Sequence, residues 1–271
     1  TRTLGFILPD LENPSYARIA KQLEKGARAR GYQLLIASSD DAPDSERQLL
    51  KLFRARRCDA LFVASCLPAE DDSYRTLQEL GIPIIAIDRT LDPTRFSSVI
   101  SDDCEASLQL TRSLLQPMPR QIVLIGARPE LSVSQARAAG FKKALEHFEG
   151  DILIEHGSAF SRECGRRIID ELLERLGHFP DALVTTSYVL LQGMFDALLE
   201  HPEQKPPLRL ATFGDTQLLD FLPLPVNAMG QQHQKIAEKA LDLALAAIED
   251  QRYEPGIHAI ARVFKQRIHQ A

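Results

Sequence analysis

An acid and a base stand side by side where an apolar run ends. Residues 84–87 read Ile-Ile-Ala-Ile, which is typical of a buried strand, and Asp88 and Arg89 follow at once. Ligands of open parallel sheets bind beyond the carboxyl ends of the strands. A carboxylate accepts hydrogen bonds from hydroxyls, and a guanidinium donates through a rigid fork. The pair is therefore interpreted as part of a ligand site rather than as a solvated turn.

Other polar side chains follow apolar runs in the same way. They are Asp10, Ser65, Ser187 and Asp215. If two sheets face each other across a cleft with these strand ends inward, the polar side chains converge in that cleft.

The segment after the first apolar run starts a helix that extends from Ser15 to about Arg30. Asn13 is a good N-cap, and Pro14 suits the first helical position. The amides near Ser15 and Tyr16 are then expected to be unpaired and to favour an anion. The alternative is a capped helix with nothing bound.

A second helix, over about 134–147, carries Arg137 near its start. Together with Arg89 it gives the predicted cleft two guanidiniums, which is more positive charge than a neutral sugar needs. The ligand is therefore expected to be an anion, with a phosphate as the natural candidate. Asp88 and Asp215 would accept hydrogen bonds from its hydroxyls.

An enzymatic role is not expected. Asp88 and Asp215 resemble an acid–base pair, but the sequence has no nucleophile elbow, HExxH, P-loop or GxGxxG motif. The four cysteines and seven histidines have no metal-ligand spacing. No catalytic residue, cofactor or metal is predicted.

Composition indicates a protein that binds no nucleic acid through these residues. The net charge is −5, and the basic residues are scattered among acidic ones. The basic cluster of Arg262, Lys265 and Arg267 is expected to be a solvated terminus. The chain has no signal peptide and no apolar run long enough for a membrane helix, so a cytoplasmic protein with reduced thiols is expected.

Short apolar runs alternate with amphipathic helices, which predicts an α/β fold with parallel sheets. The pattern occurs twice: "CDALFVAS" (58–65) in the first half corresponds to "PDALVTTS" (180–187) in the second. The sequence therefore predicts two doubly wound parallel-sheet lobes with a ligand cleft between them.

The end of the chain does not repeat this pattern. One helix (233–250) and one strand (256–264) cannot form a core of their own, so they must add to the earlier units. We expect an N-terminal lobe of residues 1–100 plus 230–255 and a C-terminal lobe of residues 101–229 plus 256–271.

Several strings resemble the effector-binding core of the LacI/GalR family of bacterial transcription regulators, a core that is similar to type I periplasmic sugar-binding proteins. They are "LGFILPDLENPSYARIAKQLEKGARARGYQLLIASS", "PIIAIDR" and "RAAGFKKAL". Further strings resemble a fructose-responsive branch of that family. They are "PDLENPSY", "PELSVS", "TTSYVLLQG" and "TFGDTQLLDFL".

The resemblance implies an allosteric repressor whose effector is fructose 1-phosphate or a related sugar phosphate. Effector binding would move the lobes and release operator DNA. The DNA would be held by an N-terminal helix-turn-helix domain that is absent from these residues, and the protein would be a homodimer or homotetramer. The implied ligand contacts, in which Phe160 packs on the sugar, are Ser15, Tyr16, Asp88, Arg89, Arg137, Phe160, Asp215 and Gln231.

Two departures concern the second lobe. The family's usual Asn-Asp is Ser187-Tyr188 here, and its Gly-Phe-Asp-Asp is "TFGD", which keeps only the second acid, Asp215. Both departures weaken a plain hexose site. The alternatives are a periplasmic sugar-binding protein of the same fold and an enzyme acting on phosphosugars.

Overall fold

The chain forms two compact units, and each is assembled from separate stretches of sequence. The structure is a computed structural model that describes residues 1–207 and 209–269. The first unit is Thr1–Ser101 with Gln232–Ala261, and the second is Asp102–Gln231 with Arg262–Ala271. The chain therefore passes from one unit to the other three times.

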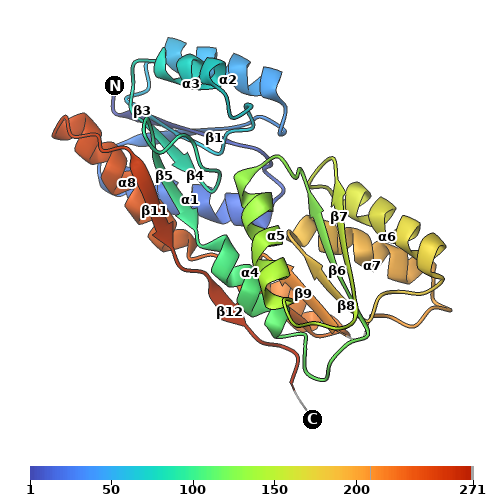
Figure 1. Ribbon diagram of the computed structural model, residues 1–271. Helices are drawn as coiled ribbons and strands as arrows, with labels where there is room; N and C mark the ends of the chain where they lie inside the picture. The colour runs from blue at the N-terminus through green and yellow to red at the C-terminus, as the bar shows by residue number, and fades with distance from the viewer. Residues whose placement is uncertain (208, 270–271) are drawn as a thin grey trace. The chain divides into compact units, whose positions relative to one another are not determined.

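The first unit has a six-stranded parallel sheet in the order β11-β5-β4-β3-β1-β2 (Figure 1). Its strands are β1 (Thr3–Leu8), β2 (Gln33–Ser38), β3 (Ala60–Val63), β4 (Ile84–Ile87), β5 (Ser97–Ser101) and β11 (Gly256–Ile260). Its helices are α1 (Pro14–Ala29), α2 (Pro43–Ala55), α3 (Asp71–Gln78) and α8 (His233–Glu249).

Helices cover both faces of this sheet because successive strand residues point to opposite sides. Phe6 and Leu8 belong to the core under α1 and α8, whereas Ile7 belongs to the core under α2 and α3 (Figure 1). Helix α1 begins as predicted, with Asn13 as the N-cap, and Gly31 after its end has the left-handed φ of +79°.

The second unit has a sheet in the order β12-β10-β9-β8-β6-β7, in which only β12 is antiparallel. Its strands are β6 (Gln121–Ala127), β7 (Asp151–Gly157), β8 (Ala182–Thr185), β9 (Arg209–Phe213), β10 (Val226–Gly230) and β12 (Val263–Lys265). Its helices are α4 (Asp103–Arg112), α5 (Ser132–Ala144), α6 (Arg162–Leu176), α7 (Tyr188–Glu200) and the short 3-10 helix η1 (Gln217–Phe221).

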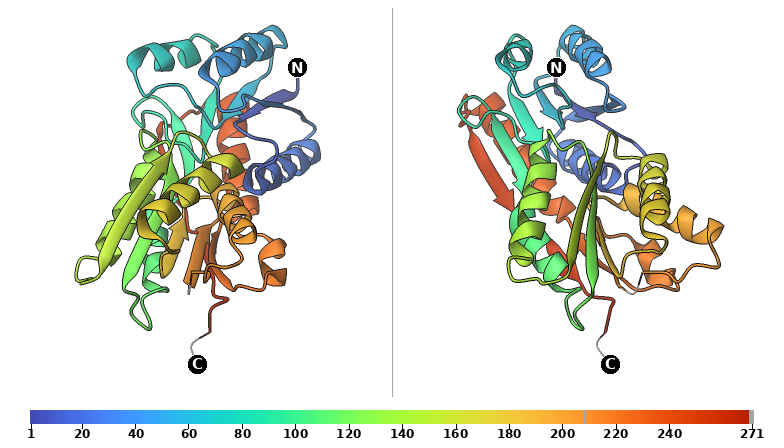
Figure 2. Two further views of the ribbon diagram at one scale, coloured as in Figure 1. Left: turned by 90° about the vertical axis from the view of Figure 1, so that its right-hand side faces the viewer. Right: turned by 45° about the vertical axis from the view of Figure 1, so that its right-hand side comes forward.

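Two helix pairs enclose this second sheet. Helices α4 and α5 pack side by side over one core, and α6 and α7 pack side by side over the other (Figure 2). The strand order β7-β6-β8-β9-β10 repeats the order β2-β1-β3-β4-β5 of the first sheet. The predicted α/β class and the predicted duplication are therefore confirmed.

The predicted last strand, 256–264, is wrong: it is two strands, one in each sheet. Strand β11 pairs with β5 in the first sheet and β12 with β10 in the second, and the chain crosses between Ala261 and Arg262. The expected boundaries placed residues 256–261 in the second unit. The structure places them in the first unit.

Four elements of regular structure were not predicted, namely β5, α4, the short 3-10 helix η1 and β10. Strand β5 contains three serines, so it has no apolar run to reveal it. The predicted strand 208–213 begins with Leu208, which lies outside the described residues, and β9 starts at Arg209. Over residues 1–207 and 209–269, no helix has the length and apolar character that a bilayer span requires.

Candidate functional site

The carboxyl end of β4 carries Asp88 and Arg89, as predicted. Asp88 has a left-handed φ of +68°, and its Oδ2 accepts a 2.7 Å hydrogen bond from the hydroxyl of Tyr16. Arg89 is 6% exposed, and its Nη1 lies 2.6 Å from Oδ1 of Asp41. The structure thus joins Tyr16, Asp88 and Arg89, three of the predicted ligand contacts, in one unit.

A buried carboxylate lies beneath this group. Glu46 accepts hydrogen bonds from the Ser65 hydroxyl at 2.6 Å and from the Cys66 amide at 2.8 Å. Burial raises the pKa of Glu46, against the opposing effect of the two hydrogen bonds and of nearby Arg89. The carbonyl of Ser65 also lies 3.5 Å from Nη1 of Arg89. By binding Ser65 and Cys66, Glu46 therefore fixes the loop that contacts Arg89.

The start of α1 differs from the predicted anion site in one respect. Oδ1 of Asn13 accepts the amide of Ser15 at 3.0 Å, so the cap already uses this amide. The prediction of an unpaired amide at Ser15 is therefore wrong. The hydroxyl of Ser15 instead lies 3.1 Å from Nε2 of His233, the first residue of α8.

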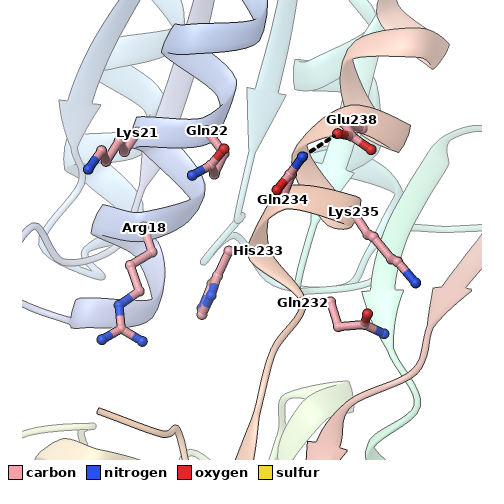
Figure 3. A pocket seen from close by; sticks show the side chains of 8 residues that line it. All are labelled: Arg18, Lys21, Gln22, Gln232, His233, Gln234, Lys235 and Glu238. Carbon is pink, nitrogen blue, oxygen red and sulfur yellow. Dashed lines mark hydrogen bonds between the residues drawn. The ribbon is translucent and has the colours of Figure 1, made fainter. Parts of the chain in front are cut away.

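A hollow of about 560 Å³ adjoins this contact, between α1 and the start of α8. Figure 3 shows Arg18, Lys21 and Gln22 on α1, with Arg18 beside His233 at the start of α8. The residues that line the hollow are Arg18, Lys21, Gln22, Gln232, His233, Gln234, Lys235 and Glu238. Three cations and one carboxylate belong to this lining, so its net charge favours anions.

In the second unit the predicted contact Arg137 is buried inside an ion cluster. Nε of Arg137 donates to Oδ2 of Asp103 at 2.8 Å, and Nε of Arg262 donates to Oδ1 of Asp103 at 2.6 Å. Burial alone would raise the pKa of Asp103, but Arg137 and Arg262 outweigh it and hold the pKa below its ordinary value. Asp103 therefore stays a carboxylate.

The remaining predicted contacts of this unit follow three different strands. Phe160 comes after β7 and is partly buried against the core under α6 and α7, Asp215 comes after β9, and Gln231 follows β10. With Arg137 they all lie in segments that follow strands of this one sheet.

The prediction that the basic tail is a solvated terminus is wrong. The side chain of Arg262 is 3% exposed, and that of Arg267 is 9% exposed. Nη2 of Arg267 lies 2.7 Å from Oδ1 of Asp215, and Lys265 lies 3.1 Å from Asp220. The tail is folded because carboxylates of its own unit pair with its cations.

Five residues of these groups were missed from the sequence: Asp41, Glu46, Asp103, His233 and Arg262. Asp103 follows a strand end, the signal that identified Asp88, but the strand itself was not recognised. The other four lie far in sequence from the residues that they contact, and no local pattern marks them.

The four cysteines form no disulfide within residues 1–207 and 209–269, where three are buried and Cys104 is partly exposed. The same described ranges contain no group of three or more histidine, cysteine, aspartate or glutamate side chains suited to a metal ion.

Residues 1–216 match the family described as periplasmic binding proteins and sugar binding domain of LacI family. The fructose operon regulatory protein of Vibrio cholerae is 48% identical over 267 residues, which cover 98% of this chain and 81% of the relative. The catabolite repressor/activator of Escherichia coli K12 is 40% identical over 269 residues, covering 98% and 80%.

A crystal structure shows the same relationship at higher identity. It is that of the Cra transcriptional dual regulator from Pseudomonas putida in complex with fructose 1-phosphate. It superposes with a TM-score of 0.96 at 72% identity and covers 99% of this chain and 100% of its own. The resemblance noted in the sequence, to the fructose repressor and the catabolite repressor/activator Cra, is confirmed.

Proposed function

Because this chain belongs to the family of periplasmic binding proteins and LacI sugar-binding domains, we propose that it senses fructose 1-phosphate for a bacterial transcription regulator. The observation that carries the proposal is the Pseudomonas putida Cra complex, whose protein is 72% identical and whose ligand is fructose 1-phosphate. The curated relatives are named as regulators, which supports sensing rather than catalysis.

The charges around Asp103 in the second unit, and of Asp88 and Arg89 in the first, support an anionic sugar as the effector. Arg137 and Arg262 share a single carboxylate, Asp103, so these three side chains together carry one positive charge. Asp88 offers a carboxylate for sugar hydroxyls, and Arg89 is fixed beside it by Asp41. Phosphate and hydroxyl groups thus each find a suitable partner.

We propose that the arginines bind the phosphate of the effector and that the aspartates accept hydrogen bonds from its hydroxyls. Phe160 would pack on the sugar face. The proposed contacts are Ser15, Tyr16, Asp88, Arg89, Arg137, Phe160, Asp215 and Gln231.

The proposed output is release of operator DNA. DNA contact is assigned to an N-terminal helix-turn-helix domain outside these 271 residues, in a cytoplasmic homodimer or homotetramer. Effector and operator would each weaken the binding of the other by the same factor, because coupling between two sites is reciprocal.

A thermal-shift series with four sugars tests the effector. The sugars are fructose 1-phosphate, fructose 6-phosphate, fructose 1,6-bisphosphate and fructose. A ligand at a hundred times its Kd stabilises the fold by about 2.7 kcal/mol, and fructose 1-phosphate is expected to raise Tm while fructose does not. A rise with free fructose alone would refute the sugar-phosphate assignment and favour a plain sugar-binding protein.

Two substitutions test the contacts. Arg89→Ala and Arg137→Ala are each expected to abolish the Tm rise with fructose 1-phosphate while circular dichroism still reports a folded chain. Unaltered affinity in both variants would contradict the assignment of the site.

A further inference from the structure

One carboxylate of the second unit serves two arginines. Each oxygen of Asp103 accepts one Nε, Oδ2 that of Arg137 and Oδ1 that of Arg262. All three side chains are buried, with 8%, 4% and 3% of their surfaces exposed for Arg137, Asp103 and Arg262. Water therefore screens this cluster little.

The sharing matters for the charge that Arg137 presents. With Arg137 alone, Asp103 would form a pair of zero net charge. Arg262 adds a second buried cation on the other oxygen of the same carboxylate, so the cluster becomes positive by one charge. In a protein interior such a charge acts over several ångströms.

Both guanidiniums are also fixed in orientation. Their Cζ atoms lie 4.6 Å (Arg137) and 5.0 Å (Arg262) from the ring centroid of Phe213. Nη1 of Arg137 donates to the Thr186 carbonyl at 2.6 Å, and Nη1 of Arg262 donates to the Met229 carbonyl at 3.3 Å. An arginine held on several sides loses little freedom when it binds an anion.

We propose that Asp103 and Arg262 are positioning residues for Arg137, an inference that rests on the proposed function. Asp103 fixes the guanidinium of Arg137. Arg262 offsets the negative charge of Asp103. Arg137 therefore acts toward the phosphate as a cation and not as half of a neutral pair. Arg262 thereby determines the preference for a phosphorylated sugar without touching it.

The test is isothermal titration of fructose 1-phosphate into the unaltered chain and into three variants. Arg262→Gln removes the positive charge. Arg262→Lys keeps the charge but loses the planar set of N–H donors of the guanidinium. Lys265→Gln is the matched control, because Lys265 belongs to the same tail but pairs with Asp220, which is half-exposed, and not with the buried Asp103. Tm is recorded for each variant without ligand.

The affinity is expected to follow charge and not stability. Arg262→Gln should raise Kd about tenfold or more, while Arg262→Lys and Lys265→Gln should stay within about threefold of the unaltered chain. Both Arg262→Gln and Arg262→Lys should have lowered Tm values, since neither has the guanidinium that joins Asp103 to the Met229 carbonyl.

Two outcomes would overturn the inference while leaving the proposed function intact. One is an equal loss of affinity in Arg262→Gln and Arg262→Lys, which would mean that Arg262 has only a structural role. The other is an unchanged Kd in Arg262→Gln. Absence of binding to the unaltered chain would overturn the proposed function itself, and this inference with it.

Discussion

Nη1 of Arg89 lies 2.6 Å from Oδ1 of Asp41, a residue 48 positions earlier in the chain. The guanidinium is almost fully buried, and Asp41 lies in the loop after β2. Burial would lower the pKa of Arg89, but Tyr16, Asp41 and Asp88 together raise it above its ordinary value. The cation is therefore permanent, and its direction is set by the loop that carries Asp41.

This contact predicts that Asp41→Asn weakens effector binding. Hydrogen bonds to charged groups contribute about 1.5–3 kcal/mol, so Kd for fructose 1-phosphate should rise about tenfold or more. Isothermal titration measures the change. Asp40→Asn is the control, because Asp40 is an exposed neighbour on the same loop. Equal Kd values for the two variants would show that Asp41 does not orient Arg89.

The hydroxyl of Tyr16 gives a second prediction. It donates to Oδ2 of Asp88, so Tyr16→Phe leaves this carboxylate with one donor fewer and a less fixed direction. Affinity for fructose 1-phosphate should fall about tenfold with little change in Tm. Tyr32→Phe, which removes a hydroxyl bonded to Glu249, is the matched control and should bind like the unaltered chain.

The buried Glu46 predicts a pH dependence of stability. Because burial raises its pKa in the folded state, the native protein binds more protons than the unfolded chain between the two pKa values. The contribution of Glu46 is thus fully present below the unfolded pKa and is lost as pH rises through the folded pKa. The stability of Glu46→Gln relative to the unaltered chain should therefore increase with pH.

Urea unfolding at several pH values between 4 and 8 measures this difference. The exposed Glu79→Gln serves as the control for loss of a carboxylate at the surface. A difference for Glu46→Gln that does not change with pH would mean that Glu46 titrates alike in both states.

Gly140, in the "RAAGFKKAL" string, predicts a packing effect. A Cβ at this position would lie 2.2 Å from the Cys104 carbonyl oxygen and 2.7 Å from Cβ of Ser107, both on α4. Gly140→Ala should therefore destabilise the fold by about 1–3 kcal/mol, although alanine is the better helix former. Urea unfolding checks this, with the exposed Ala139→Ser as the control; a more stable Gly140→Ala would contradict it.

Features that lie close together in sequence were predicted well. A few consecutive residues are enough to recognise the apolar runs of β1, β3 and β8 and the cap at Asn13. Strand β5 was missed because its side chains Ser97, Ser98 and Ser101 are polar although buried. Its buried faces are filled by hydroxyls, which periodicity of apolar residues does not detect.

The candidate site was predicted in its strand-end residues but not in what holds them. Asp88, Arg89 and Arg137 follow from their places in the pattern, whereas Arg262 lies 159 residues from Asp103. A charged residue in a tail is usually solvated, and only the tertiary fold brings this one to a buried carboxylate.

The discontinuity of both units has a consequence for synthesis. The first unit lacks α8 and β11, and the second lacks β12, until residues beyond 231 have left the ribosome. Helix α8 covers part of the core that contains Phe6 and Phe62. A nascent chain that ends at Gln231 lacks this helix, so the apolar face of the first sheet is covered by α1 alone. The first unit is complete once residues 232–261 have emerged, and the second only after the strand β12 has followed, so neither core can be finished before the chain has passed Gln231.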